Sequence, residues 1–378
     1  MLHMRTKNQL IIISIFLLLG SCITQFVPDT EEVKELLVVE GLITDQNEVN
    51  TVKLSKSLPL GKKNVAKPVM GCFVTIQDDR GVTRQLFEIS PGTYVTNPNS
   101  FRGVPGRKYT LKINTNSYPN YSYESIPMEM KPVPSIDTLY YDKVVINESN
   151  QLSEITEGCH VYLDTHDAEN KCQYYRWDYI ETWEFRIPFE VQNRVCWITN
   201  SSGRIQIKTT SVLEENRINR YALNFISNAT DRLKVKYSML VNQYSINEDE
   251  YLYWEKLKNV SEDVGSLYDI TPATIQSNIT CIEDPKEKVL GYFSVSARSS
   301  KRIFIKDTFM GIGNLYSQCI SDTILGTGPV PGLYSSVWVI MDRTYEIPPY
   351  RVVTEHKGCA DCTTRGTTTE PLFWRDDN

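Results

Sequence analysis

The sequence predicts a mainly β protein, in which an N-terminal β-sandwich is followed by a larger β-rich domain with one or few helices. Short segments that alternate between apolar and polar residues recur along the 378 residues, with glycine, proline and aspartate between them. This is the pattern of strands joined by tight turns. The chain also has 22 tyrosines and 6 tryptophans, and aromatic side chains favour strands.

The first residues have the layout of an export signal that ends in a cysteine. Arg5 and Lys7 supply positive charge, residues 10–19 are almost wholly apolar, and the sequence LGSC ends at Cys22. A membrane-spanning helix needs about 20 apolar residues, so a cleaved signal is favoured over an uncleaved anchor. The arrangement resembles a bacterial lipobox.

A lipobox predicts that residues 1–21 are removed and that Cys22 is acylated as the new N-terminus. Each buried CH₂ contributes about 0.8 kcal/mol, so several acyl chains hold a protein firmly where one chain is marginal. Residues 22–34 then form a polar tether, and no later segment is long and apolar enough to span a membrane. The sequence therefore predicts a lipid-anchored protein whose folded part faces water.

Residues 35–135 are predicted to form a small immunoglobulin-like or transthyretin-like β-sandwich. The turn at residues 78–81 ends in glycine, which accepts a positive φ. A proline-rich stretch at residues 119–134 disfavours a central strand and places a domain boundary near residue 135. Strand-like segments lie at residues 36–44, 50–57, 72–89, 90–96 and 101–114.

Residues 136–378 are predicted to form the second, β-rich domain. Residues 157–189 are expected to make one long hairpin, which turns at residues 167–170 and returns through a dense aromatic strand. From residue 363 onward, threonine, glycine and proline indicate a loop. Further strands are expected at residues 139–146, 204–211, 220–227, 232–246, 289–297 and 302–306.

One helix is predicted, from about residue 247 to residue 260. Ser245 and Glu248 have the spacing of a capping box at its start. An apolar face at helical spacing is formed by Tyr253, Trp254, Leu257 and Val260.

Composition limits the partners and indicates the compartment. The net charge of −6 argues against a nucleic-acid partner, because phosphates require a basic surface. Eight of the nine cysteines remain after Cys22, and an even number in an oxidising compartment indicates disulfides. The sequence leaves open their connectivity and how many stay reduced. The candidate disulfide cysteines are Cys72, Cys159, Cys172, Cys196, Cys281, Cys319, Cys359 and Cys362.

Cys359 and Cys362 form a C-x-x-C pair, which in a redox enzyme opens a helix after a strand. The segment TTRGTTT that follows is a poor helix, so redox catalysis is disfavoured. A zinc site made of both cysteines, His356 and a distant fourth ligand is the other alternative. Structural disulfides are favoured over both, because they are the norm in exported chains.

A second polar cluster lies on the first strand of the expected hairpin. His160, Asp164 and His166 share one face of that strand, and Asp167 follows them. Such a group is able to hold a metal, but a fourth ligand and supporting hydrogen-bond partners are not evident. A solvated, polar hairpin end is the favoured interpretation.

The sequence indicates no catalytic residue, cofactor or metal site. Nucleophile-elbow, zinc-protease and P-loop patterns are absent. Gly311-Ile312-Gly313 lacks the third glycine and the βαβ context of a dinucleotide fingerprint, so a turn is predicted there. Carboxylates are numerous, but no pair is singled out for glycoside cleavage.

Several segments, in order along the chain, resemble the DUF4249 lipoproteins of Bacteroidetes. They include LVVEGLITDQ, VTIQDDRG and FRGVPGRKYTLKI near the N-terminus, YYRWDYIETWEF in the centre, and the distinctive YSMLVNQYSINEDEYLYWEKLK. The tail CADCTTRGTTTEPLFW is similar to the terminal C-x-D-C…G-T…P-x-F-W pattern of the family, although Arg365 stands where members usually have glycine. The resemblance covers nearly all of the chain after the signal.

This resemblance implies a cell-envelope lipoprotein without a described enzymatic activity, anchored in outer-membrane lipid by palmitate and other acyl chains on Cys22. It also implies a partner, because members are typically encoded beside TonB-dependent outer-membrane receptors of the SusC type. Surface-exported lipoproteins often carry acids just after the lipidated cysteine, but here ITQF follows and the first acid is Asp29. The sequence therefore leaves open which membrane face the protein occupies.

The leading functional hypothesis is a non-enzymatic accessory that helps a TonB-dependent barrel to capture or gate a substrate. Exposed aromatic side chains are the expected contacts, because tyrosine and tryptophan offer large contact area at low entropic cost. The first alternative is a structural subunit of an outer-membrane protein assembly complex. The second alternative is a surface hydrolase that uses carboxylates.

Overall fold

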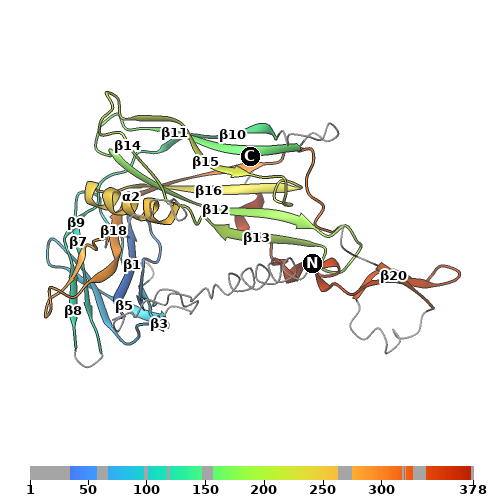
Figure 1. Ribbon diagram of the computed structural model, residues 1–378, viewed down its shortest axis with the longest axis horizontal. Helices are drawn as coiled ribbons and strands as arrows, with labels where there is room; N and C mark the ends of the chain where they lie inside the picture. The colour runs from blue at the N-terminus through green and yellow to red at the C-terminus, as the bar shows by residue number, and fades with distance from the viewer. Residues whose placement is uncertain are drawn as a thin grey trace, which may run out of the picture. The chain divides into compact units, whose positions relative to one another are not determined.

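Strands dominate the computed structural model, and α2 (Glu248–Glu262) is the one α-helix of its described part (Figure 1). The prediction of a mainly β protein is therefore confirmed. The predicted signal, Cys22 and the tether lie outside the described residues. The structure describes residues 35–57, 67–97, 101–116, 120–146, 156–262, 275–316, 319, 321–326 and 338–375.

The N-terminal strands belong to a single sheet. Its strands are β1 (Leu37–Thr44), β2 (Thr51–Lys56), β3 (Lys67–Pro68), β4 (Phe73–Asp78), β5 (Thr83–Ser90), β6 (Thr93–Thr96), β7 (Lys108–Asn114), β8 (Ser122–Ser125), β9 (Met128–Glu129), β17 (Ile279–Cys281) and β18 (Val289–Ser296). The sheet runs in the order β17-β8-β7-β4-β5-β6-β2-β1-β18, with β3 beside β2 and β9 beside β7. Its pairs are antiparallel except β1 with β18, which run parallel.

The sheet curls until its two ends nearly meet, which makes it barrel-like. Asn278, just before β17, bridges the ends: its Nδ2 donates to Phe293 O of β18 (2.8 Å), and its Oδ1 accepts from Phe293 N (2.9 Å). Alternate residues of each strand point inward, as Leu37, Val39 and Ile43 of β1 do. One buried apolar core fills the interior.

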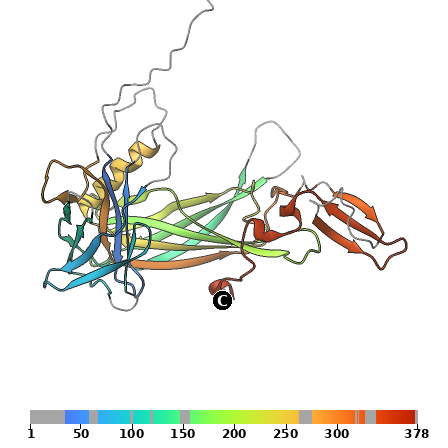
Figure 2. The ribbon, with the colours of Figure 1, turned by 90° about the horizontal axis from the view of Figure 1, so that it is seen from below.

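Two late segments complete this N-terminal sheet. β18 pairs with β1 along its whole length, from Leu37↔Val289 to Thr44↔Ser296, and the blue β1 lies beside the orange β18 in Figures 1 and 2. β17 pairs with β8. The sheet therefore contains residues from both sides of the boundary expected near residue 135.

The central part of the chain forms two sheets that share a second core. One sheet has the order β10-β11-β15, and the other has the order β13-β12-β16-β19, with β14 beside β12. Their apolar faces contact each other in a single cluster, as in a β-sandwich. These strands are β10 (Ile136–Ile146), β11 (Thr156–His166), β12 (Tyr174–Arg186), β13 (Val195–Ser201), β14 (Gln206–Thr209), β15 (Arg217–Ile226), β16 (Lys236–Ser245) and β19 (Arg298–Ile305).

A buried amide ties the two layers together. Gln243 of β16 accepts from Trp177 Nε1 (2.9 Å) and donates to Thr165 Oγ1 of the opposite sheet (3.0 Å) and to Pro134 O (2.9 Å). All polar atoms of this side chain are satisfied, so its burial does not carry the cost of an unpaired group.

The predicted hairpin at residues 157–189 is wrong, because β11 and β12 belong to different sheets. The connection crosses from one layer to the other and brings the apolar faces of the two strands together. Asp167 stabilises this crossing, since its Oδ2 accepts from the main-chain N of Lys171 and Cys172 (both 2.7 Å). Strand alternation is the same in a hairpin and in a sheet-crossing arch, so the sequence pattern does not separate them.

The predicted helix is confirmed as α2, but its predicted capping box is wrong. Ser245 is the last residue of β16, and its buried Oγ has no hydrogen-bond partner. Asn247 precedes the helix instead, and its main-chain oxygen accepts from Tyr251 N (2.9 Å). Every helix in the described part of the chain is too short or too polar to cross a bilayer.

A small third region follows at the C-terminus. It contains a sheet in the order β20-β22-β21 and three short 3₁₀ helices. The predicted loop after residue 363 contains two of these helices and is held to the central sandwich, as described below. The elements are β20 (Ser321–Leu325), β21 (Trp338–Arg343), β22 (Tyr350–Thr354), η2 (Lys357–Cys359), η3 (Cys362–Thr364) and η4 (Leu372–Arg375).

Candidate functional site

A hollow of about 440 Å³ lies between α2, the outer face of β1 and β18, and β12. We name it the Arg176 pocket. Its walls combine three aromatic rings with charges of both signs. These residues are Tyr253, Trp254, Tyr292, Glu40, Lys53, Arg176 and Asp178.

Strand alternation places these side chains. In β1, Val39 points into the barrel-like sheet, so Glu40 points outward and pairs across the strands with Lys53 of β2. In β12, Tyr175 and Trp177 fill the sandwich core, which turns Arg176 to the other face. The pocket is therefore formed by the outward faces of two sheets and the helix between them.

Arg176 is held by aromatic rings. Its guanidinium carbon lies 4.6 Å from the centroid of the Tyr244 ring and 5.0 Å from that of Trp254. A cation–π contact of this kind contributes about 0.5–2 kcal/mol. Its Nε is buried and has no hydrogen-bond partner, so the side chain keeps an unused donor beside the pocket.

Glu250 of α2 lies behind the pocket wall and is fully buried. Its Oε1 accepts from Ser294 Oγ (2.6 Å) and Trp254 Nε1 (3.2 Å), whereas its Oε2 has no partner. Burial raises the pKa of this carboxyl group, and the opposing effects of Arg176 and the two hydrogen bonds are smaller. The carboxyl group thus fixes the Trp254 ring while favouring its own neutral form.

The floor of the pocket requires a glycine. Gly291 has a φ of +85°, and a Cβ there would lie 2.0 Å from Val39 O. Only glycine tolerates both the left-handed conformation and this close approach of β18 to β1.

The chemistry of the Arg176 pocket suits binding. Aromatic faces accept an apolar or ring-shaped surface of a ligand, and fixed charges orient its polar groups. Both Lys53 and Glu40 are exposed at its mouth, so an incoming ligand meets both signs of charge.

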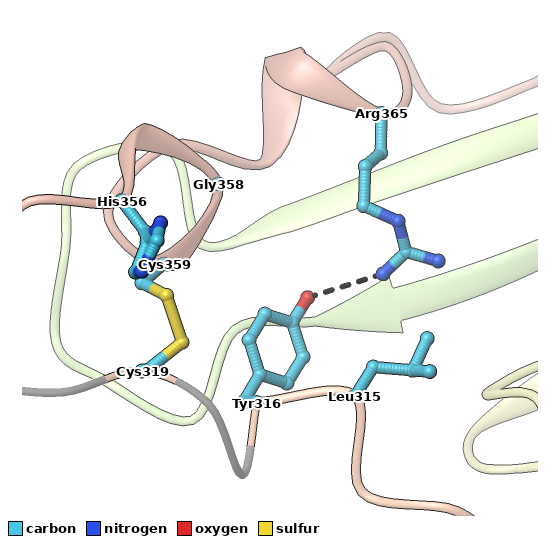
Figure 3. A pocket seen from close by; sticks show the side chains of 7 residues that line it. All are labelled: Leu315, Tyr316, Cys319, His356, Gly358, Cys359 and Arg365. Atoms are coloured by element: carbon cyan, nitrogen blue, oxygen red, sulfur yellow. Dashed lines mark hydrogen bonds between the residues drawn. A yellow bond between two sulfur atoms is a disulfide. The ribbon is translucent and has the colours of Figure 1, made fainter. Parts of the chain in front are cut away.

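A second cavity, of about 370 Å³, lies beside the disulfide Cys319–Cys359 (Figure 3). The Tyr316 hydroxyl, which accepts from Arg365 (3.4 Å), and His356 line it. Arg365 also forms a bidentate ion pair with the buried Asp231 (2.8 and 3.1 Å). The arginine is already satisfied by this pair, so the cavity offers a ligand fewer unused groups than the Arg176 pocket does.

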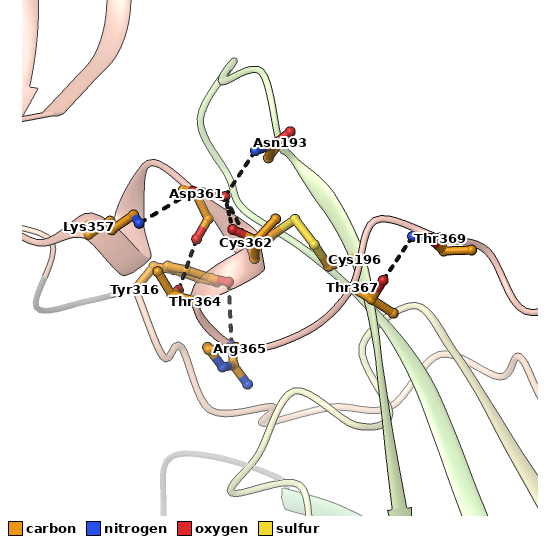
Figure 4. The surroundings of a disulfide bond; sticks show 11 residues. Asn193, Cys196, Tyr316, Lys357, Asp361, Cys362, Thr364, Arg365, Thr367 and Thr369 are labelled. Atoms are coloured by element: carbon orange, nitrogen blue, oxygen red, sulfur yellow. Dashed lines mark hydrogen bonds and ion pairs between the residues drawn. A yellow bond between two sulfur atoms is a disulfide. The ribbon is translucent and has the colours of Figure 1, made fainter.

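The C-x-x-C motif forms two structural disulfides rather than a dithiol centre. Cys362 pairs with Cys196 of β13 (Figure 4), and Cys359 pairs with Cys319 (Figure 3). Asp361, between them, accepts from Asn193 Nδ2 (3.1 Å). Both sulfurs are consumed by these bonds, so neither redox cycling within the motif nor a zinc site on its thiolates fits the structure.

The other four candidate cysteines are free in the structure. Cys159, Cys172 and Cys281 are buried, and Cys72 is half-buried. Burial raises the pKa of both Cys159 and Cys172 to about 12. These two thiols therefore stay protonated at neutral pH and behave as small apolar core residues.

The histidine cluster on β11 is dispersed among separate partners. His166 Nδ1 contacts Asp137 Oδ2 (2.7 Å), and Asp164 Oδ1 accepts from Arg220 N (2.6 Å). The His160 ring lies against that of Phe225, with centroids 4.7 Å apart. Within the described ranges, no three His, Cys, Asp or Glu side chains are arranged to hold a metal ion.

Sequence reasoning missed Arg176, Glu250 and Arg365. Alternation does signal that Arg176 faces away from the core, because aromatic residues flank it on both sides. Glu250 has no such signal: it follows Glu248 and Asp249 in an acidic first turn, which is typical of an exposed helix N-terminus. The one signal for Arg365 is that it stands where family members usually have glycine.

A family model matches most of the chain. The family model described as "Domain of unknown function (DUF4249)" matches residues 23–302, which confirms the predicted family. The matched region includes every residue named in the Arg176 pocket and Cys196, and it ends before Cys319, Cys359, Cys362 and the C-terminal sheet. No curated protein has a matching sequence.

Proposed function

The chain belongs to the DUF4249 family, and from this premise we propose that it is a lipid-anchored protein of the cell envelope that binds its ligand without transforming it. The disulfides Cys196–Cys362 and Cys319–Cys359 are the observation that carries this proposal. Such bonds persist in oxidising compartments outside the cytosol. The lipobox at Cys22 supplies the attachment.

The partner in this proposal is a TonB-dependent β-barrel of the outer membrane, which the family resemblance supports. The protein acts as the accessory of this barrel in capturing or gating a substrate. The Arg176 pocket is the substrate contact, because Trp254 and the stacked guanidinium together suit a ligand with an apolar face and polar groups.

Co-purification tests the partner. The protein, tagged and expressed at its native level, is isolated from detergent-solubilised outer membranes, and the proteins that accompany it are identified. We expect a TonB-dependent barrel among them, and we expect the Cys22→Ala variant to leave the outer-membrane fraction. Recovery of no barrel protein would contradict the proposal.

Pocket variants test the substrate contact. Trp254→Ala and Arg176→Gln should reproduce the growth defect of a deletion on the substrate that the barrel imports, while the barrel still co-purifies. Trp338→Ala is the matched control, since it removes a partly exposed tryptophan outside the pocket. Equal growth of all three variants would exclude the pocket as the contact.

Depletion of the protein separates this role from that of an assembly subunit. Loss of an accessory gives a growth defect on one substrate, whereas loss of an assembly subunit lowers the level of many barrel proteins.

For the hydrolase alternative, the buried carboxylates of β12 offer little support. Glu181 pairs with Arg232 (3.2 Å) and Glu184 pairs with Arg186 (2.6 Å), which suits a structural role.

A further inference from the structure

We propose that one end of the barrel-like sheet rests on the lipid surface, with four large apolar side chains in the headgroup region. The inference rests on the proposed anchor at Cys22. The four residues, which we name the Phe87 patch, are well exposed to solvent. They are Met70 (59 %), Phe73 (51 %), Phe87 (51 %) and Ile89 (68 %).

Strand register brings these side chains together. β4 and β5 pair through Val74↔Leu86, both of which point into the core. Phe73 and Phe87 adjoin this pair on the two strands, so they lie near each other on the outer face. Ile89 is two residues further along β5, where the pairing with β6 shifts register between Glu88 and Ser90, and its side chain is exposed.

The patch lies at the end of the sheet where the chain enters β1. Leu37 pairs with Lys56 at the end of β2, and Lys56 pairs with Lys67 of β3. Met70 lies two residues after β3. Across the sheet, Ser90 at the end of β5 pairs with Thr93 at the start of β6, and Thr93 pairs with Lys53 in the middle of β2.

The anchor therefore brings this end of the sheet to the bilayer. Fifteen residues lead from Cys22 to Leu37, so the tether reaches at most about 50 Å when fully extended. Along the chain, the surface around Leu37 is the first part of the sheet after the point of attachment. A tether of this length holds the patch at a high effective concentration next to the lipid.

Size and composition favour a lipid surface over a protein partner. A stable protein interface usually contains about 20–30 residues on each side, which is far more than this patch offers. Shallow burial of Phe, Ile and Met side chains at the boundary between headgroups and acyl chains needs only a few residues. The paired Lys56 and Lys67 add positive charge beside anionic headgroups.

Vesicle binding tests the patch without the anchor. The full mature chain with Cys22→Ser is mixed with vesicles of phosphatidylethanolamine and phosphatidylglycerol, and the bound fraction is measured by flotation. We expect measurable binding that persists at high salt, and we expect the double variant Phe87→Ser/Ile89→Ser to lower it at least fivefold. Thermal melting verifies that each variant is folded.

The matched control changes two apolar residues elsewhere that are even more exposed. The double variant Val212→Ser/Ile347→Ser alters side chains that are 87 % and 98 % exposed, and it should bind vesicles as the parent does. An equal loss in both double variants, or no binding by the parent, would overturn the inference.

Photocrosslinking tests the same contact in the anchored protein. The acylated chain carries a benzophenone amino acid at position 89 or, as the control, at position 347, and it is reconstituted in the same vesicles. We expect lipid adducts from position 89 only. Adducts with protein at position 89 in native membranes would overturn the inference in favour of a protein partner. Absence of acylation at Cys22 would instead contradict the proposed anchor, and the flotation assay distinguishes the two failures.

Discussion

Glu250 links the stability of the fold to pH. Burial raises the pKa of its carboxyl group in the folded state, so the folded chain holds this proton more tightly than the unfolded chain does. The resulting stability is fully present below the ordinary pKa of glutamate and is lost as pH rises through the folded-state pKa. Above that pH, the fold carries a buried charge whose Oε2 has no partner.

Glu250→Gln should therefore stabilise the protein at pH 8 by about 1–3 kcal/mol, because the amide removes the buried charge, although its Nε2 takes the unpartnered place of Oε2. The neutral amide still accepts from Ser294 and Trp254. The advantage should shrink as the pH falls towards 4. Thermal unfolding across this pH range measures the effect, with the exposed Glu248→Gln on the same helix as the control. A constant difference at all pH values would contradict the assignment.

Gly291 tests whether the close approach of β18 to β1 is required. Gly291→Ala should cost more than about 3 kcal/mol, because a Cβ would lie 2.0 Å from Val39 O in addition to the positive φ. Gly81→Ala is the control: Gly81 has a similar φ of +82°, but no atom lies within 4 Å of its Cβ position, so about 1 kcal/mol is expected. Chemical denaturation of both variants measures the difference, and equal costs would show that the clash is relieved.

At the residue scale, the sequence predicts which side chains point away from the core but not which residues they contact. Alternation in β12 predicts that Arg176 points away from the sandwich. Its stacking on Trp254 depends on α2, which lies about 75 residues later in the chain. The burial of Glu250 is likewise a consequence of how α2 packs. The sequence does not indicate it, because three consecutive acidic residues are typical of an exposed helix N-terminus.

At the scale of elements, the C-terminal tail is held against the central sandwich by a disulfide and a hydrogen bond. Cys196–Cys362 closes a sequence separation of 166 residues, and Cys319–Cys359 closes one of 40. Trp374 adds a hydrogen bond from Nε1 to Glu184 Oε2 (3.3 Å). Cys196–Cys362 and the Trp374 hydrogen bond connect residues inside the family match to residues beyond it, whereas Cys319–Cys359 joins two residues beyond the match.

Removing the longer link should destabilise the protein more than removing the shorter one. In the chain-entropy account, the double variant Cys196→Ala/Cys362→Ala loses about 5 kcal/mol and Cys319→Ala/Cys359→Ala loses about 4 kcal/mol. Denaturant unfolding of the oxidised proteins measures both values. If removing a pair had no effect, that disulfide would add nothing to the stability that the other contacts of the tail provide.

The sequence predicts where helices and strands lie more reliably than which strands pair with each other. The helix and most strands appear where periodicity expects them, since side-chain spacing is a local property. The predicted hairpin failed because β11 and β12 keep the same alternation whether they pair or face each other. What separates the two arrangements is the long-range pairing of β12 with β16, which no local pattern reports.

At the scale of the whole molecule, the N-terminal sheet depends on residues that are remote in sequence. Among the described residues of 35–135, β1 pairs with β2 alone, and its other side is covered by β18. β8 likewise needs β17. A boundary drawn from prolines near residue 135 is reasonable locally, but the sheet crosses it twice.

A fragment of residues 35–135 should therefore fail to fold, although its composition is that of a small domain. Without β18, the main-chain groups of β1 lie unpaired at an open edge, and the core on the side of Phe293 is exposed to water. Joining residues 275–297 to the fragment through a flexible linker of about 15 residues should restore both edge strands and the Asn278 bridge. Cooperative thermal unfolding followed by circular dichroism distinguishes the two chains. A cooperative transition in the shorter fragment would mean that the curled sheet forms before the late strands arrive, and that β17 and β18 only close it.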